Sequence, residues 1–373
     1  AAFSTDPFIQ GCTNQVERRK YLLNAYADTQ DDPEGEYDAY FAKVQARKVT
    51  PVPPKACAKP APAPAVAGWP LKDANAASAL QLGDIFELAP VTTKTVELGR
   101  GQSMTFRLIP AGTFCMGRAD GANDERPCAA VTIARPFWIS ETEVRNDQYA
   151  VYDPEHDSGW QDQCGKDHGA PGGVGGRRRM PVVRVSWNEA KAFCDWLAKT
   201  TGEKAALPTE AQWEWAARAG TATPFPWGGL DDDFSPYANF ADKDVRNMSL
   251  GWEGKAGAMR TRRPFRIEQN FPLHDERWKD DWFCLNYVGR AQANVWGLYD
   301  MHGNASEWTR SDYRPYPYVD GDGRNAQDPS TKKVARGGSF ASRPREGTSS
   351  FRLAYEPWQK VFDVGFRVVL EAE

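Results

Sequence analysis

The chain has 373 residues, of which 41% are hydrophobic, so it can bury the core of one large domain or two ordinary ones. The net charge is -4 and the basic clusters at residues 177–179 and 260–266 are short, which argues against a nucleic-acid-binding protein. No run of 18 apolar residues occurs, so we expect no transmembrane helix.

The N-terminus suggests export. The chain begins Ala1-Ala2-Phe3, without an initiator methionine, which is what a signal-peptidase cut after small residues would leave. A chain trimmed at this end by other means would look the same. We expect a periplasmic or extracellular protein.

The first 79 residues predict an arm and a linker. Residues 14–28 and 37–44 carry apolar side chains at helical spacing, which predicts two short helices in an N-terminal helical arm, residues 1–50. Residues 51–79 begin with a dense Pro/Ala run that favours extended polyproline II backbone. We therefore place the main domain at residues 80–373.

The main domain combines short strands with two well-marked helices. Residues 103–110 alternate as a strand, and residues 112–116 begin the next one. Ser186 and Thr209 each open a capping box that starts a helix, and Gly220 is placed to end the second one. This mixture predicts an α+β, loop-rich fold.

The seven cysteines show no C-x-x-C pair and no metal-ligand spacing with histidine, which argues against a zinc module. Disulfides are the better interpretation. Cys115 and Cys128 flank a predicted hairpin, and Cys12 is placed to join the arm to Cys57. Cys194 lies on the apolar face of a predicted helix, which favours a buried free thiol.

One long motif carries a family resemblance. Residues 294–308 follow the pattern N-x-W-G-L-x-D-M-x-G-N-x-x-E-W, which resembles the signature of the formylglycine-generating enzyme, or sulfatase-modifying factor, family. Other segments resemble that family in the same order, at residues 106–117, 123–127, 137–149, 181–190, 207–220, 336–340 and 364–368. The resemblance implies a variant of the C-type lectin fold. Most motif residues are expected to maintain that fold, Gly337 and Gly338 by their backbone freedom and Trp213, Trp215 and Trp308 as core fillers.

The resemblance also implies structural calcium, because hard cations bind carboxylate, amide and backbone oxygens together. Two sets of residues match the family's calcium ligands. The first is Asn239, Phe240, Asp281 and Phe283, and the second is Gly303, Asn304, Ala305 and Glu307. Turn capping by the same polar side chains is the alternative interpretation.

Copper is not expected. Formylglycine-generating enzymes hold copper between two cysteines just after the R-G-G-S strand, and here Ser342 and Gly347 occupy those positions. Serine is a hard, weak ligand and glycine offers none, so a thiolate copper site cannot form from them. The remaining candidates for a pocket, which we expect to bind an anionic or peptide ligand, are Ser339, Ser342, Arg343, Arg345, Glu346, Trp308 and Arg352. A surface ion pair between Arg345 and Glu346 is the alternative.

Three functions stay open. The favoured one is a non-catalytic binding or accessory component of a cell-envelope complex, a pseudoenzyme that holds a protein partner, a glycan or a peptide. The second is a noncanonical oxidoreductase or maturation enzyme acting on a peptide-like or siderophore-like substrate, with Glu346 or Glu307 as acid or base. The third is a true formylglycine-generating oxidase.

Overall fold

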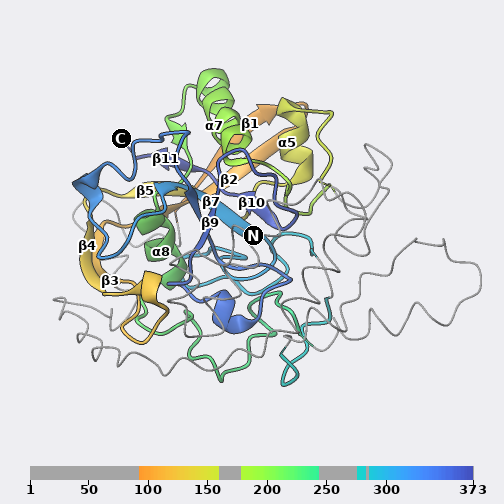
Figure 1. The fold of residues 1–373 in the computed structure, drawn as a ribbon. Helices are drawn as coiled ribbons and strands as arrows, with labels where there is room; N and C mark the ends of the chain where they lie inside the picture. Colours follow the sequence, from red (N-terminus) through yellow and green to blue (C-terminus); the bar gives the residue numbers. More distant parts are fainter. Residues whose placement is uncertain (1–91, 159–177, 243–274, 283–284, 373) are drawn as a thin grey trace, which may run out of the picture.

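The computed structural model describes residues 92–158, 178–242, 275–282 and 285–372 (Figure 1). The arm and linker predicted over residues 1–79 lie outside this part of the chain. Among the described residues, no helix combines the length and apolar character needed to cross a bilayer.

A five-stranded antiparallel sheet joins the beginning of the described domain to its end. Its strands, in spatial order, are β1 (Thr93–Gly99), β2 (Gln102–Ile109), β5 (Phe137–Ser140), β11 (Val369–Glu371) and β6 (Ala205–Ala206). The last strand of the domain, β11, pairs with both β5 and β6. The strand predicted over residues 103–110 is confirmed as β2, although the alternation of buried residues holds only as far as Phe106.

Two further sheets position the loops of interest. The strands of the first, in spatial order, are β10 (Val364–Phe366), β7 (Ser306–Asp312), β8 (Lys333–Arg336) and β9 (Leu353–Tyr355). The second pairs β3 (Gly112–Met116) with β4 (Ala129–Ile133). Strand β7 continues the 294–308 motif and is buried along most of its length, so the motif runs into the centre of the domain.

Three α-helices pack on these sheets: α5 (Asn146–Tyr152), α7 (Trp187–Thr201) and α8 (Glu210–Arg218). The capping boxes predicted at Ser186 and Thr209 are confirmed at the starts of α7 and α8. Helix α8 ends one residue earlier than predicted, because Ala219 already adopts the left-handed conformation before Gly220. In Figure 1, α7 and α5 lie at the top of the view and α8 lies below them, close to β3.

Tryptophan side chains fill the centre of the fold. Trp213, Trp215 and Trp308 are all fully buried, as predicted from the motif. Their indole N–H groups donate to oxygens within the protein, at Glu307, Pro110 and Val185 respectively. Satisfied indoles of this kind fix irregular segments in place.

Candidate functional site

The loop that follows β8 carries most of the predicted pocket residues. Strand β8 stops at Arg336 because Gly337 and Gly338 have φ values of 91° and 68°. A Cβ built on Gly338 would lie 2.7 Å from the Glu346 carbonyl oxygen, so the two ends of the loop touch where only glycine fits. The predicted role of these glycines is confirmed.

Two serines meet at the start of this loop. The Ser339 backbone N–H donates to Ser342 Oγ at 3.1 Å, and the two hydroxyl oxygens are 3.5 Å apart. Ser339 Oγ also donates to Asp363 Oδ2 at 2.6 Å. The structure therefore adds Asp363, which precedes β10, to the pair predicted from sequence.

Gly347 has no room for a side chain. A Cβ built there would lie 2.2 Å from Phe240 Cε1 and 2.8 Å from the Gly337 carbonyl oxygen. Phe240 is fully buried. His302 also contacts Gly347, since its Nδ1–H donates to the Gly347 carbonyl oxygen at 2.8 Å. Burial lowers the pKa of His302 to about 4, so the ring is neutral at pH 7.

Glu346 serves the loop itself. Its carboxylate accepts from the Arg343 backbone N–H at 2.9 Å and from Arg343 Nη2 at 3.0 Å, closing the short 3₁₀ helix η4 (Pro344–Glu346). Glu346 is 1% exposed, whereas Arg345 is exposed. The alternative of a surface ion pair between Arg345 and Glu346 is wrong, because the partner of Glu346 is Arg343.

Two pocket candidates lie in the core. Trp308 is fully buried among apolar residues. Arg352 is also fully buried, and it binds Glu210 through Nε at 2.5 Å and Nη2 at 3.1 Å. Neither side chain lies along the Ser339–Gly347 loop.

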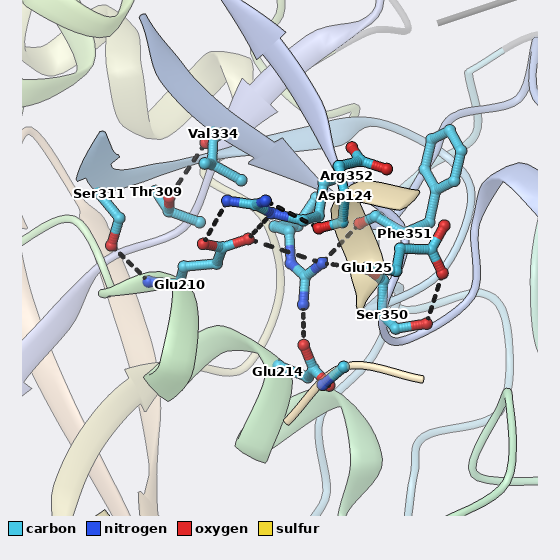
Figure 2. A network of polar contacts seen from close by, with 12 residues as sticks. Asp124, Glu125, Glu210, Glu214, Thr309, Ser311, Val334, Ser350, Phe351 and Arg352 are labelled. Atoms are coloured by element: carbon cyan, nitrogen blue, oxygen red, sulfur yellow. Dashed lines mark hydrogen bonds and ion pairs between the residues drawn. The ribbon is translucent and has the colours of Figure 1, made fainter. Parts of the chain in front are cut away.

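Arg352 belongs to a buried charge network (Figure 2), because its partner Glu210 also lies 3.8 Å from Arg336 Nη1 through Oε1. Glu214 binds both Arg336 and Arg218, all of them buried. Arg336 also donates to the carbonyl oxygens of Ser349, Ser350 and Phe351. The network ties α8 to the segment that follows the loop.

The predicted calcium ligands fall into different surroundings. Asn239 and Asn304 lie together: the Asn304 backbone N–H donates to the Asn239 carbonyl oxygen at 2.8 Å, and Asn239 Nδ2 donates to Asn304 Oδ1 at 3.3 Å. Gly303 pairs with Asn239 in an isolated bridge, and Ala305 is buried beside Phe340. Residues from both predicted sets therefore meet at one place.

Glu307, by contrast, is engaged by an arginine. Arg367 contacts it through Nε and Nη2, each at 2.6 Å, and Trp213 Nε1 donates to it at 2.6 Å. All three side chains are buried. The charge of Glu307 is thus balanced by Arg367, a residue that sequence reasoning missed.

The Asp281 segment adjoins Asn239. Asp281 is at the surface and pairs with Lys279, while its neighbour Asp280 is buried and accepts from the Phe240 backbone N–H at 2.9 Å. Phe283 lies outside the described residues.

A pair of buried acids that the sequence did not single out lies behind Asn304. Asn304 Nδ2 donates to Glu143 Oε1 at 2.9 Å, and Glu143 is hydrogen-bonded to Asp300. Burial raises the pKa of Glu143 well above its ordinary value and that of Asp300 to about 6. Each of the two carboxyl groups therefore binds a proton more readily than an ordinary carboxyl group does.

Comparison with known proteins decides the family. The protein-family model described as "Sulfatase-modifying factor enzyme 1-like domain" matches residues 93–372. The chain belongs to this family. The resemblance inferred from the 294–308 motif is confirmed.

Relatives within the sulfatase-modifying factor family include proteins named as active and as inactive. The chain is 28% identical to the bovine "Inactive C-alpha-formylglycine-generating enzyme 2", over 61% of this chain and 77% of the relative. It is 29% identical to the formylglycine-generating enzyme of Mycobacterium tuberculosis, over 57% of this chain and 63% of the relative. The structure of PvdO from Pseudomonas aeruginosa is similar with a TM-score of 0.56 and 25% identity, covering 76% of this chain and 99% of that one.

The residues present do not fit the family's copper ion. Ser342 Oγ already accepts the Ser339 N–H, and the space beside Gly347 is filled by Phe240. Neither position supplies a thiolate, and soft Cu(I) requires thiolates. Among the described residues, no cluster of three or more histidine, cysteine or acidic side chains forms an alternative metal centre.

Proposed function

We propose that this chain is a non-oxidising member of the sulfatase-modifying factor family, an exported binding or accessory component of a cell-envelope complex. The observation that carries the proposal is the contact between Gly347 and Phe240. Gly347 offers no ligand, and the Phe240 ring occupies the space that a side chain at position 347 would need. A position filled in this way supports a role other than copper-dependent oxidation.

The polar residues of the loop support binding better than catalysis. The carboxylate of Glu346 closes η4, and that of Glu307 is held by Arg367 and Trp213. A carboxylate whose oxygens are held by fixed donors is poorly placed to act as an acid or base on a substrate, because it would have to give up those contacts. Arg345 remains exposed and can pair with an acidic group of a partner.

Four further features of the protein are proposed from its sequence. They are a C-type-lectin-like arrangement of the domain, an N-terminal arm and linker before residue 80, a periplasmic or extracellular location and structural calcium.

A capture experiment tests this function. The tagged full chain is incubated with the solubilised envelope fraction of the source organism, and the proteins retained are quantified against the soluble fraction. We expect a stoichiometric envelope partner, with capture weakened at least several-fold by Arg345→Glu. Lys199→Glu, a matched charge reversal on α7, should leave capture unchanged. Equal capture by both variants, or no enriched partner, contradicts the proposed role.

One observation favours a second candidate, the maturation enzyme acting on a peptide-like or siderophore-like substrate. Ser339 Oγ is 2.6 Å from a carboxylate oxygen of Asp363, a contact that can orient a hydroxyl toward substrate. Substrate turnover that Ser339→Ala abolishes, with folding intact, would favour this candidate over the first.

A further inference from the structure

Cys115 and Cys128 are brought together at the base of the loop between β3 and β4. Cys115 lies on β3 opposite Ala130 of β4, and Cys128 immediately precedes β4. Because alternate residues of a strand face the same side, Cys128 is the diagonal neighbour of Cys115 on that face. The two thiols are hydrogen-bonded to each other, and neither is oxidised.

The two sulfurs differ in accessibility and acidity. Cys115 is 9% exposed, whereas Cys128 is half-buried. The hydrogen bond from Cys115 lowers the pKa of Cys128, and the same bond together with burial raises the pKa of Cys115. Cys128 is therefore the sulfur that reacts first with a reagent from solution.

The loop that these cysteines bracket contacts the buried charge network. Arg352 Nη1 donates to the Asp124 carbonyl oxygen at 2.9 Å, and Ser350 Oγ donates to Glu125 Oε2 at 2.9 Å (Figure 2). Arg218 Nη2 donates to the Gly117 carbonyl oxygen at 2.9 Å. A constraint on this loop therefore acts directly on residues of the buried charge network.

We propose that Cys115 and Cys128 form a reversible intrachain disulfide that locks the β3–β4 loop onto the buried charge network. The oxidant is a disulfide, such as oxidised glutathione. The Cys128 thiolate attacks it and releases one thiolate, giving a mixed disulfide. Cys115 then loses its proton and attacks Cys128 Sγ, releasing the second thiolate. Two protein thiols become one disulfide, and one oxidant disulfide becomes two thiols.

Peptide mapping of the full chain tests the proposal directly. The native protein is treated with oxidised glutathione, alkylated after unfolding, and digested with trypsin without reduction. The Arg-Pro bonds at residues 126 and 135 resist trypsin, so Cys115 falls in the peptide 108–118 and Cys128 in the peptide 119–145, each with a single cysteine. We expect these two peptides joined, and separated by reduction. Both cysteines fully alkylated, or joined to other cysteines, would overturn the proposal.

The locking role has its own readout. Closing a loop of this size should raise the melting temperature of the oxidised chain by about 5 °C relative to the reduced chain. Cys115→Ala/Cys128→Ala should show no redox-dependent shift, while Cys194→Ser, which removes a buried thiol on α7, should keep it. A linked peptide without a change in melting temperature would overturn the locking role, whatever partner the protein binds.

Discussion

Arg367 binds Glu307 through two hydrogen bonds of 2.6 Å, and both side chains are almost completely removed from solvent. Glu307 belongs to the family motif, so a residue that the sequence offered as a calcium ligand is a structural anion here. The pair joins β7 to the segment between β10 and β11.

Removing Arg367 alone should be strongly destabilising. Arg367→Leu leaves the Glu307 carboxylate buried without its cation, and we expect the free energy of unfolding to fall by about 3–5 kcal/mol. Urea unfolding at pH 7 measures the change. The control is Arg367→Leu/Glu307→Leu, which removes both charges and should recover part of the loss. A double variant less stable than Arg367→Leu would show that the unpaired Glu307 carboxylate is not the main cause of the lost stability.

Restoring the cysteine at position 347 should cost stability and give no copper site. We expect Gly347→Cys to lower the free energy of unfolding by about 1–3 kcal/mol because of the clash with Phe240. Ser342→Cys, a nearly isosteric control, should cost less. In the Phe240→Ala background the Gly347→Cys substitution should be better tolerated, a coupling that a double-mutant cycle detects. Additive effects of Gly347→Cys and Phe240→Ala on stability would contradict the contact between these two residues.

How much of this arrangement the sequence predicts depends on the range of the interactions. Helices α7 and α8 were predicted because the capping boxes at Ser186 and Thr209 lie within four residues of each helix start. Helix α5 was not predicted, because its N-cap residue is Arg145, which lacks the usual signal. Strands β1 and β4 were also not predicted, although the residues of β1 alternate between exposed and buried positions at the edge of the sheet.

The same difference between local and long-range interactions applies to the candidate site. Ser342 and Gly347 were singled out from sequence because they sit at fixed positions after a local motif. The contact of Phe240 with Gly347 and the pairing of Glu307 with Arg367 join residues that are distant in the chain. Buried arginines such as Arg352 resemble surface residues in sequence, because their burial depends on a carboxylate that only the fold brings to them.

His302 should make the protein sensitive to acid. Its pKa is about 4 in the folded chain, below its ordinary value near 6.5, so between these values the unfolded chain binds the extra proton. Its contribution to stability is present above about pH 6.5 and is lost as the pH falls toward 4, by up to roughly 3 kcal/mol. The Asp300 pKa, raised to about 6, acts in the opposite direction over an overlapping range.

Comparison with His302→Gln isolates this contribution. Glutamine can still donate to the Gly347 carbonyl oxygen but does not titrate. We expect the unfolding free energy of the native sequence, measured in urea from pH 4 to 7, to rise more steeply with pH than that of His302→Gln. Parallel curves would mean that His302 titrates alike in the folded and unfolded chains.

Calcium should bind near Asn239 and Asp281 and not at Glu307. The exposed pair between Asp281 and Lys279 contributes little to stability, about 0–1 kcal/mol, so a cation can displace Lys279. Calcium binding at Glu307, by contrast, would require its carboxylate to separate from Arg367. We expect chelation to lower the melting temperature of the native chain, and Asp281→Ala to weaken calcium affinity in calorimetry at least tenfold. Asp231→Ala, in an exposed turn, is the matched control; the same affinity in both variants would contradict the assignment.

An assay for formylglycine tests whether this chain is a non-oxidising member of the family. The reduced full chain is loaded with Cu(I) and incubated in air with a cysteine-containing peptide of the kind that formylglycine-generating enzymes oxidise, and the peptide is followed by mass spectrometry. We predict that its cysteine stays unmodified, because Ser342 and Gly347 cannot hold the ion and Phe240 fills the space beside Gly347. Conversion of that cysteine to the aldehyde, dependent on copper and on this protein, would show that the chain is an oxidase after all.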